Sequence, residues 1–266
     1  MTERPTPVNT TDWRWTMRRA HWALLEFLMP KRAVQCRGLH FTLRCNSWLT
    51  EYRFLTYNEK EPETLDWIDQ WLKPGETVFD IGANIGVYTI YMALRYPQTR
   101  VIAFEPEYAN LHLLRDNIID NRLQERVEAY AVALSDRTGV SHLHLQDVTP
   151  GAALHTESRV LLERTLGGAP VVLREGIWAV TLDEFCKETG LQPNAMKIDV
   201  DGTEPSILKG ATHLLHAQFL RSLLIEMPVE PEARATSEQL LRAAGMKRVW
   251  HDPHHTSPNE VWVRDV

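Results

Sequence analysis

The sequence is poor in cysteine and has no long hydrophobic run. Its 266 residues include only Cys36, Cys45 and Cys186, whose spacing matches neither a disulfide framework nor a C-x-x-C site. No apolar stretch reaches the roughly 18 residues that a membrane span needs, and the polar residues 1–11 do not resemble a secretory signal. These absences predict a cytoplasmic protein with reduced thiols, long enough to bury a core without disulfides.

Positive charge is concentrated near the start of the chain. Residues 1–53 hold nine Lys and Arg against four Asp and Glu, a net charge of +5, whereas the whole chain has 29 and 35, a net charge of −6. Residues 54–266 therefore carry −11. An acidic body of this size argues against nucleic acid as a partner. The basic start suits a membrane surface, an acidic substrate or another subunit, as in a homodimer.

Residues 1–60 are predicted to form a basic, tryptophan-rich extension made of a helix and a short hairpin. The helix is expected over residues 13–29, because Trp15, Trp22, Leu25 and Met29 fall at helical spacing. Alternation over residues 39–57 suggests the hairpin. We expect the apolar stripe of the helix to pack on the main domain; a helix lying on a membrane surface is the alternative.

Residues 61–266 are predicted to form one domain in which strands and helices alternate. Buried strands are expected at residues 77–81, 100–104, 127–134, 196–200 and 220–227. This order predicts an α/β fold with a doubly wound, mostly parallel sheet, to which a closing hairpin at 247–251 and 260–264 adds one antiparallel edge strand. Residues 146–178 contain Pro-Gly and Gly-Gly breakers and are expected to be an irregular insertion.

A glycine-bearing loop follows the first strand of the predicted sheet. Ligands of such folds bind at the carboxyl ends of the strands, and Gly82 and Gly86 allow the backbone to turn sharply there. The dinucleotide fingerprint G-x-G-x-x-G has its middle glycine where this chain has Asn84. Asp80 would repel a pyrophosphate and suits a ligand with a cationic end, such as S-adenosylmethionine. A plain strand–turn–helix corner is the alternative.

The second predicted strand ends in Glu105-Pro106, 25 positions after Asp80. An acid at this place can accept hydrogen bonds from both ribose hydroxyls of an adenosine cofactor. A solvated acid at a strand end is the alternative. Two acids at the ends of adjacent strands, with glycines beside the first, favour the cofactor site.

Six segments resemble the FkbM family of S-adenosylmethionine-dependent methyltransferases, and the resemblance covers about residues 75–227. They are DIGANIGVYT (80–89), AFEP (103–106), LLRDNIIDN (113–121), AVALSD (131–136), TLDEF (181–185) and KIDVDGTEPSILKGA (197–211). The resemblance implies a class I methyltransferase (Rossmann-like) fold with a seven-stranded sheet, and methylation of a hydroxyl oxygen on a small-molecule or glycan acceptor, a sugar or a polyketide. It implies a cofactor pocket of Asp80, Gly82, Ala83, Asn84, Gly86, Glu105, Pro106, Ala131 and Val132.

Residues that could act in catalysis gather after the fourth predicted strand. Lys197, Asp199 and Asp201 alternate along it, and Glu204 opens the next helix. Asp199 is the first candidate for a base or substrate anchor, and Lys197 could pair with it or hold a substrate anion. His155, in the insertion, is the next candidate for the base. A strand-end network of ion pairs, without a catalytic role, is the alternative.

Asp199, Asp201 and Glu204 are also three oxygen donors close in sequence that could bind magnesium, with Glu226 at the end of the fifth strand as a donor from elsewhere in the fold. This chain departs from the family's pattern here, since the family commonly has Glu-Gly-Ala-Glu where this chain has Asp201 to Glu204. Two other functions stay open at this point. One is an NAD(P)-dependent oxidoreductase, against which Asp80 and the missing middle glycine argue. The other is a non-catalytic interaction protein that binds the cofactor without turning it over.

Overall fold

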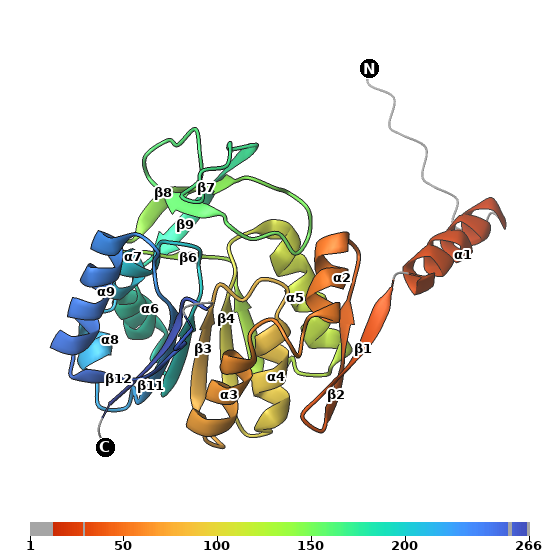
Figure 1. Cartoon of the computed structure of the whole chain (residues 1–266). Helices are drawn as coiled ribbons and strands as arrows, with labels where there is room; N and C mark the ends of the chain where they lie inside the picture. Colours follow the sequence, from red (N-terminus) through yellow and green to blue (C-terminus); the bar gives the residue numbers. More distant parts are fainter. Residues whose placement is uncertain (1–12, 29, 255–256, 265–266) are drawn as a thin grey trace.

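A computed structural model describes residues 13–28, 30–254 and 257–264 of the chain. A seven-stranded sheet with helices on both faces forms its centre, and a four-stranded sheet lies above the upper end of the large one in Figure 1. The large sheet has the order β12 (Met246–His251), β13 (Asn259–Arg264), β11 (Ser222–Glu226), β10 (Ala195–Ile198), β3 (Thr77–Ile81), β4 (Arg100–Phe104) and β5 (Val127–Tyr130).

The large sheet is mostly parallel. Strands β11, β10, β3, β4 and β5 run parallel to one another, whereas β13 runs antiparallel to both β11 and β12. The predicted fold class is confirmed. The antiparallel strand lies one place inside the edge, because the closing hairpin puts its second strand, β13, against β11 and leaves β12 outermost.

Helices cover both faces because successive strand residues point to opposite sides of the sheet. Val78 of β3 packs in one hydrophobic cluster and Phe79 in the other, and both are fully buried. The first cluster includes residues of α3 (Pro62–Trp71), α4 (Val87–Arg95) and α5 (Tyr108–Asp120). The second includes residues of α6 (Leu182–Thr189), α7 (Glu204–Lys209), α8 (Thr212–His216) and α9 (Pro231–Ala243).

The order of the strands fixes where a ligand can bind. The chain passes outward from β3 through β4 to β5 and then returns to β10, on the other side of β3. The sheet therefore reverses its order between β3 and β10, and the crevice at the carboxyl ends of these strands is the usual ligand site of open α/β sheets. In the register of the pair, Lys197 lies opposite Asp80.

The N-terminal hairpin differs from its predicted position. It comprises β1 (Lys31–Cys36) and β2 (Leu39–Arg44), joined by Arg37 and Gly38, which both have positive φ, as a two-residue turn of this type requires. Residues 48–55, expected in the hairpin, form the helix α2 (Trp48–Leu55), because Ser47 and Thr50 make a reciprocal capping box. Phe41 and Leu43 of β2 join the same cluster as α4 and α5, and a functional boundary at residue 60 stays a prediction.

Helix α1 (Trp13–Leu28) projects away from the rest of the chain (Figure 1). Its side chains Trp13, Met17 and Leu24 are exposed. The stripe expected to pack on the domain, formed by Trp15, Trp22, Leu25 and Met29, lies outside the described side chains. No helix in the described ranges is long and apolar enough to cross a membrane.

The expected insertion is more regular than predicted. Strands β6 (Ala133–Leu134), β9 (Leu173–Val180), β7 (Gly139–Leu145) and β8 (Thr156–Ser158) form the four-stranded sheet in that order. β8 and most of β9 fall within residues 146–178, where no strand was expected. Their pairing with β7, over three residue pairs for β8 and seven for β9, makes them strands, and the local sequence does not indicate this pairing. Of the loop residues of this segment, Ala152, Ala153 and His155 line a cavity together with Gly82, which follows β3, and Asp199, which follows β10.

Candidate active site

The loop after β3 is held tightly between β4 and β10. The backbone N–H groups of Gly82 and Ala83 both donate to the carbonyl of Phe104, at 3.0 Å each. Gly82 has φ +80, and a β-carbon on it would lie 1.8 Å from the carbonyl oxygen of Asp199. Only glycine therefore fits at position 82. Asn84 also has a positive φ, +51, a conformation that asparagine tolerates better than most residues.

Glu105 is fixed at the end of β4 by the backbone around it. Its carboxylate accepts hydrogen bonds from the backbone N–H of Asn84 at 2.7 Å and of Glu107 at 2.9 Å. Burial raises the pKa of Glu105 to about 7, and these two N–H groups oppose the rise. Each carboxylate oxygen keeps a second lone pair. Glu105 can therefore accept further hydrogen bonds from a ligand.

A cavity of about 600 Å³, open to solvent, lies over this loop. One part of its wall is apolar and includes Phe104, Val132, Leu134 and Leu143; the other is polar and includes Gly82, Asn84, Glu105, His155, Asp199 and Asp201. An adenosyl cofactor has an apolar, flat base at one end and a polar amino acid at the other. The cavity fits such a molecule in its division of apolar and polar wall.

The residues of the implied cofactor pocket divide into two groups. Gly82, Asn84, Glu105, Pro106 and Val132 line the cavity. The others do not line it: Asp80, Ala83, Gly86 and Ala131. Where the structure gives these residues a role, they affect the cavity indirectly, through the residues that they contact. A β-carbon on Gly86, for example, would lie 2.5 Å from the Leu114 side chain, so this glycine lets α4 and α5 approach.

Asp80 is buried below the loop, with 1% of its surface exposed. Its carboxylate accepts a hydrogen bond from the Thr89 hydroxyl, and its second oxygen has no partner among the residues that the structure describes. Burial raises the pKa of Asp80, and the charge of Lys197 opposes this rise. Its negative charge can act on a cationic ligand only through the loop. Direct contact of Asp80 with the cofactor stays a prediction.

Lys197 and Asp199 form a buried ion pair at the end of β10. Lys197 is 3% exposed, and its Nζ lies 2.7 Å from Oδ2 of Asp199 and 5.4 Å from the centre of the Tyr88 ring. Burial disfavours both charges, but each partner overcomes it for the other: the pKa of Lys197 is raised and that of Asp199 is lowered. Asp199 is therefore an ionised and firmly oriented hydrogen-bond acceptor.

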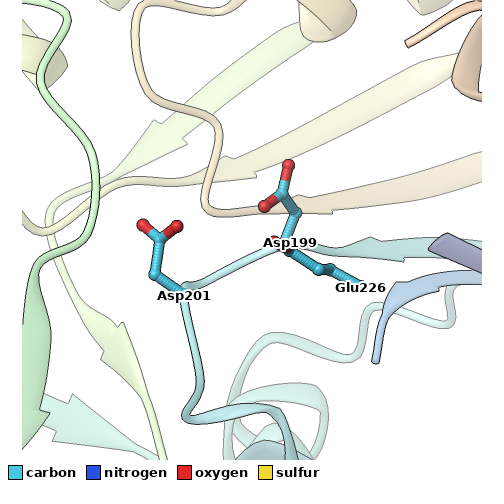
Figure 2. A group of neighbouring side chains, drawn as sticks. All are labelled: Asp199, Asp201 and Glu226. Atoms are coloured by element: carbon cyan, nitrogen blue, oxygen red, sulfur yellow. The ribbon is translucent and has the colours of Figure 1, made fainter. Parts of the chain in front are cut away.

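Asp199, Asp201 and Glu226 come together where β10 and β11 end (Figure 2). One oxygen of each lies within 4.8 Å of the others. Burial and the charge of Asp199 raise the pKa of Glu226 to about 10, and burial raises that of Asp201 to about 6. Glu226 therefore keeps a proton at neutral pH and hydrogen-bonds to Asp199. Three oxygen donors at this spacing would also suit a divalent cation.

Two further catalytic candidates have different surroundings. Glu204 does not line the cavity; its Oε1 accepts from the backbone N–H of Gly202 at 3.1 Å and of Val200 at 3.3 Å, and it holds the turn after β10. His155 does line the cavity, and in the described part of the chain neither of its buried ring nitrogens has a hydrogen-bond partner. Burial lowers the pKa of His155, so its ring is neutral and can accept a proton.

A second cavity, of about 840 Å³, adjoins the first. Both are lined by Gly82, Asn84, Ala153, Asp199 and Asp201, and the second also by Arg53, Lys60, Glu61, Glu63, Glu226, Ser257, Pro258 and Asn259. The carboxylates at the end of β10 thus stand on the shared wall. A molecule in the second cavity would meet a ligand of the first cavity at this place.

Residues 150–154, which we call the strap, cross between the two cavities. The Asn84 and Asn110 side chains both donate to the carbonyl of Ala152, at 2.7 and 3.0 Å. The Arg53 Nε donates to the carbonyl of Gly151 at 2.9 Å, and the backbone N–H of Leu154 donates to Asp201 at 2.6 Å. The strap, Asn110, Arg53 and Lys60 were not predicted from the sequence. The Pro150-Gly151 breaker was the one local signal.

Known proteins resemble this chain over the same region. The family described as "Methyltransferase FkbM domain" matches residues 80–245, more than half of the chain. The 31-O-demethyl-FK506 methyltransferase FkbM of Streptomyces tacrolimicus is 32% identical over 159 residues, which are 52% of this chain and 60% of that protein. Methyltransferase sdnD of Sordaria araneosa is 26% identical over 191 residues, 63% of this chain and 72% of that protein.

Among solved structures, Aeropyrum pernix fibrillarin with bound S-adenosyl-L-methionine superposes with a TM-score of 0.47 and 12% identity, over 88% of this chain and 82% of that one. The matched region of the family begins at Asp80 and ends at Gly245. It therefore contains the loop after β3, Glu105, the strap and the carboxylates at the ends of β10 and β11. The chain belongs to the FkbM family of methyltransferases.

Proposed function

We propose that this methyltransferase moves the methyl group of S-adenosylmethionine to a hydroxyl oxygen of a small-molecule or glycan acceptor, such as a sugar or a polyketide natural product. One observation carries the proposal. The cavity that fits the cofactor and the cavity beside it share a wall, and Asp199 and Asp201 stand on that wall. The name of the Streptomyces tacrolimicus relative, a 31-O-demethyl-FK506 methyltransferase, supports oxygen as the acceptor atom.

The cofactor supplies, when bound, a methyl group that its sulfonium has already made electrophilic. The chain must hold and orient it. Gly82 and Asn84 give the polar end a close-fitting backbone, Glu105 accepts from the ribose hydroxyls, and Val132 and Leu134 cover the base. Such orientation of two reactants can lower a barrier by roughly 7–11 kcal/mol. Orientation is therefore the main contribution that we assign to this site.

The acceptor hydroxyl must also lose a proton. Asp199, held by Lys197 at 2.7 Å, accepts the hydrogen bond of the hydroxyl and aims its oxygen at the first cavity. Its lowered pKa makes it a better anchor than a base. Asp201 lines both cavities and has a pKa of about 6, which suits proton uptake near neutral pH. We therefore assign the uptake of the proton to the cluster of carboxylates that includes Asp201, and His155 is the second candidate for this role.

Magnesium bound by Asp199, Asp201 and Glu226 is an alternative use of the same acids. It is the less favoured one, because Glu226 already holds a proton with a pKa of about 10 that a metal would have to displace. In that case a chelator would abolish turnover and magnesium would restore it. Without a metal, turnover is the same in both conditions.

Helix α1 supports one further proposal, a peripheral contact with a membrane or a second copy of the chain. Its exposed apolar side chains Trp13, Met17 and Leu24 are accompanied by the exposed Arg18 and Arg19. Anionic vesicles should then carry the full chain upward in a density gradient at physiological salt. If the chain stays at the bottom and is monomeric by light scattering, α1 makes neither contact.

The experiment that tests the proposed reaction uses S-adenosylmethionine labelled with ¹³C in its methyl group. The protein is incubated with panels of hydroxylated polyketides and sugars, and products are followed by carbon NMR. We expect the label in a methyl ether, at the chemical shift of an oxygen-bound methyl. Label found only on nitrogen, sulfur or carbon would contradict the proposal. A matched reaction with Asp199→Asn protein controls for transfer without the enzyme.

A further inference from the structure

The methionyl end of S-adenosylmethionine carries a carboxylate, and the cofactor cavity offers it no cation. No Lys or Arg is among the described residues that line that cavity, which contains Glu105, Glu157, Asp199 and Asp201. A carboxylate placed among these acids is repelled by their like charge, and a nearby cation offsets that repulsion. The cation must therefore come from the adjoining cavity, whose described lining includes Arg53 and Lys60.

Arg53 and Lys60 differ in what they already bind. Lys60 is ion-paired with Glu61 at 2.8 Å, and its side chain is 43% exposed. Arg53 is half-buried, and its Nε donates to the Gly151 carbonyl at 2.9 Å. In the part of the chain that the structure describes, no acid lies within ion-pair distance of Arg53. Its two terminal nitrogens are thus the donors that a carboxylate can engage, in the paired geometry that a guanidinium favours.

The strap fixes Arg53 close to the loop that would hold the methionyl end. Arg53 binds the carbonyl of Gly151, and the Asn84 side chain binds the next carbonyl, that of Ala152, at 2.7 Å. Arg53, Gly82 and Asn84 also line the same cavity. The positive charge reaches both acids beside the loop: burial raises the pKa of Glu105 and of Asp201, and the charge of Arg53 opposes each rise.

We propose that Arg53 binds the carboxylate of the cofactor's methionyl portion, so that α2, outside the region that the family match covers, completes the cofactor site. This inference rests on the proposed function, which supplies the cofactor. It gives the N-terminal segment a direct part in cofactor binding. The adenosyl portion of the cofactor, bound at Glu105 and the apolar wall, does not depend on Arg53.

Ligands with and without the carboxylate test this directly. The first pair is S-adenosylhomocysteine and 5′-methylthioadenosine, which lacks the whole amino acid. The second pair is S-adenosylmethionine and its decarboxylated form, which keeps the ammonium and the sulfonium. Calorimetry on the wild-type protein should show that removal of the carboxylate alone weakens binding about 10–100-fold, the range for a charge-assisted hydrogen bond.

In Arg53→Ala, S-adenosylhomocysteine should bind about 10–100-fold more weakly, whereas 5′-methylthioadenosine and decarboxylated S-adenosylmethionine should bind as they do to the wild type. Arg53→Lys should recover part of the loss, because it restores the charge without the paired geometry. Arg95→Ala is the matched control, since Arg95 pairs with Asp69 at 2.8 Å and lines neither cavity. It should change none of the four affinities.

Each other result contradicts the inference in its own way. Equal weakening of all four ligands in Arg53→Ala would show that Arg53 acts only through the strap. Equal affinity of the wild type for S-adenosylmethionine and its decarboxylated form would show that no cation binds the carboxylate, and this comparison needs no variant. If the wild type binds none of the four ligands, the proposed function fails, which is distinct from a failure of Arg53 alone.

Discussion

The α-carbon of Gly82 faces the backbone carbonyl of Asp199 so closely that a β-carbon there would lie 1.8 Å from the oxygen. The loop that we propose to hold the cofactor and the strand end that we propose to hold the acceptor thus touch through a contact that only glycine allows. Any side chain at position 82 must push β10 away from the loop. This contact couples the two halves of the site.

Gly82→Ala should therefore abolish cofactor binding and lower the melting temperature. The change adds a clash with backbone and a strained positive φ together. Gly75→Ala is the matched control, because Gly75 has φ +83 and a β-carbon on it would meet nothing within 4 Å; it carries the φ strain alone, about 1 kcal/mol. Calorimetry measures the cofactor affinity, and thermal melts measure the melting temperature. Cofactor affinity equal in the two variants would show that the close contact is unimportant.

Asp199→Asn should remove most turnover and leave the cofactor bound. Asparagine keeps the size of the side chain but loses the charge that anchors the hydroxyl beside Lys197, so activity should fall about 10²-fold or more. Asp66→Asn, at an exposed ion pair with Arg37, is the control. Turnover and cofactor affinity are measured on the same preparations. Near-native turnover of Asp199→Asn would make Asp199 structural and leave Asp201, and after it His155, as the residues to test.

Glu105→Ala should weaken binding of S-adenosylhomocysteine by about 10–100-fold while the domain stays folded. In the proposed site the lost carboxylate would accept hydrogen bonds from the ribose hydroxyls, a contribution of roughly 1.5–3 kcal/mol. Glu128→Ala serves as control, since Glu128 pairs with Arg100 at the surface. Calorimetry gives the affinities and circular dichroism the folded state. Unchanged affinity would place the ribose elsewhere.

The stability of the protein should fall as pH rises through the range in which Glu204 ionises. Burial raises the pKa of Glu204 from its ordinary value of 4.5 to about 7. A group whose pKa is higher in the folded than in the unfolded protein stabilises the fold fully at a pH below its unfolded-state pKa. This contribution is lost as the pH rises from the unfolded-state pKa to the folded-state pKa, here from about 4.5 to about 7. The shift corresponds to at most about 3 kcal/mol.

Glu204→Gln removes this titration and keeps an oxygen that can accept from Gly202. Its melting temperature, relative to the wild type, should rise between pH 5 and pH 8, by roughly 2–4 °C for each kcal/mol. The exposed Glu188→Gln should show no such trend. A difference between Glu204→Gln and wild type that does not change with pH would mean that Glu204 is not buried as a neutral acid.

The alternation of apolar strands and helices predicted the α/β sheet because each of these strands is short, buried and followed by a local breaker. The loop of Gly82 and the acids at the ends of β4 and β10 were visible for the same reason: their positions depend on neighbours in sequence. The hairpin over residues 39–57 was misplaced, since the Ser47 capping box outweighs the alternation of residues 48–55. Strand β9 was missed because its pairing with β7 and β6, which lie earlier in the chain, defines it.

The contacts that join distant segments could not be predicted. The strap meets Ser47 and Arg53 of the N-terminal segment, about 100 positions earlier in the chain, and no local pattern marks such a pairing. The burial of Asp80 under its loop could likewise not be predicted, because the sequence pattern of an acid at a strand end is the same whether its carboxylate faces a cavity or a helix. Local sequence identifies the candidates here, and packing decides which of them face the cavity.

The most direct test of the account is a calorimetric titration of the pure full-length protein with S-adenosylhomocysteine and, separately, with NADH. We expect one binding site for S-adenosylhomocysteine, which is lost in Gly82→Ala. We expect no binding of NADH, because the loop lacks the middle glycine of the dinucleotide fingerprint and has Asn84 in its place. Binding of NADH with no response to S-adenosylhomocysteine would contradict it.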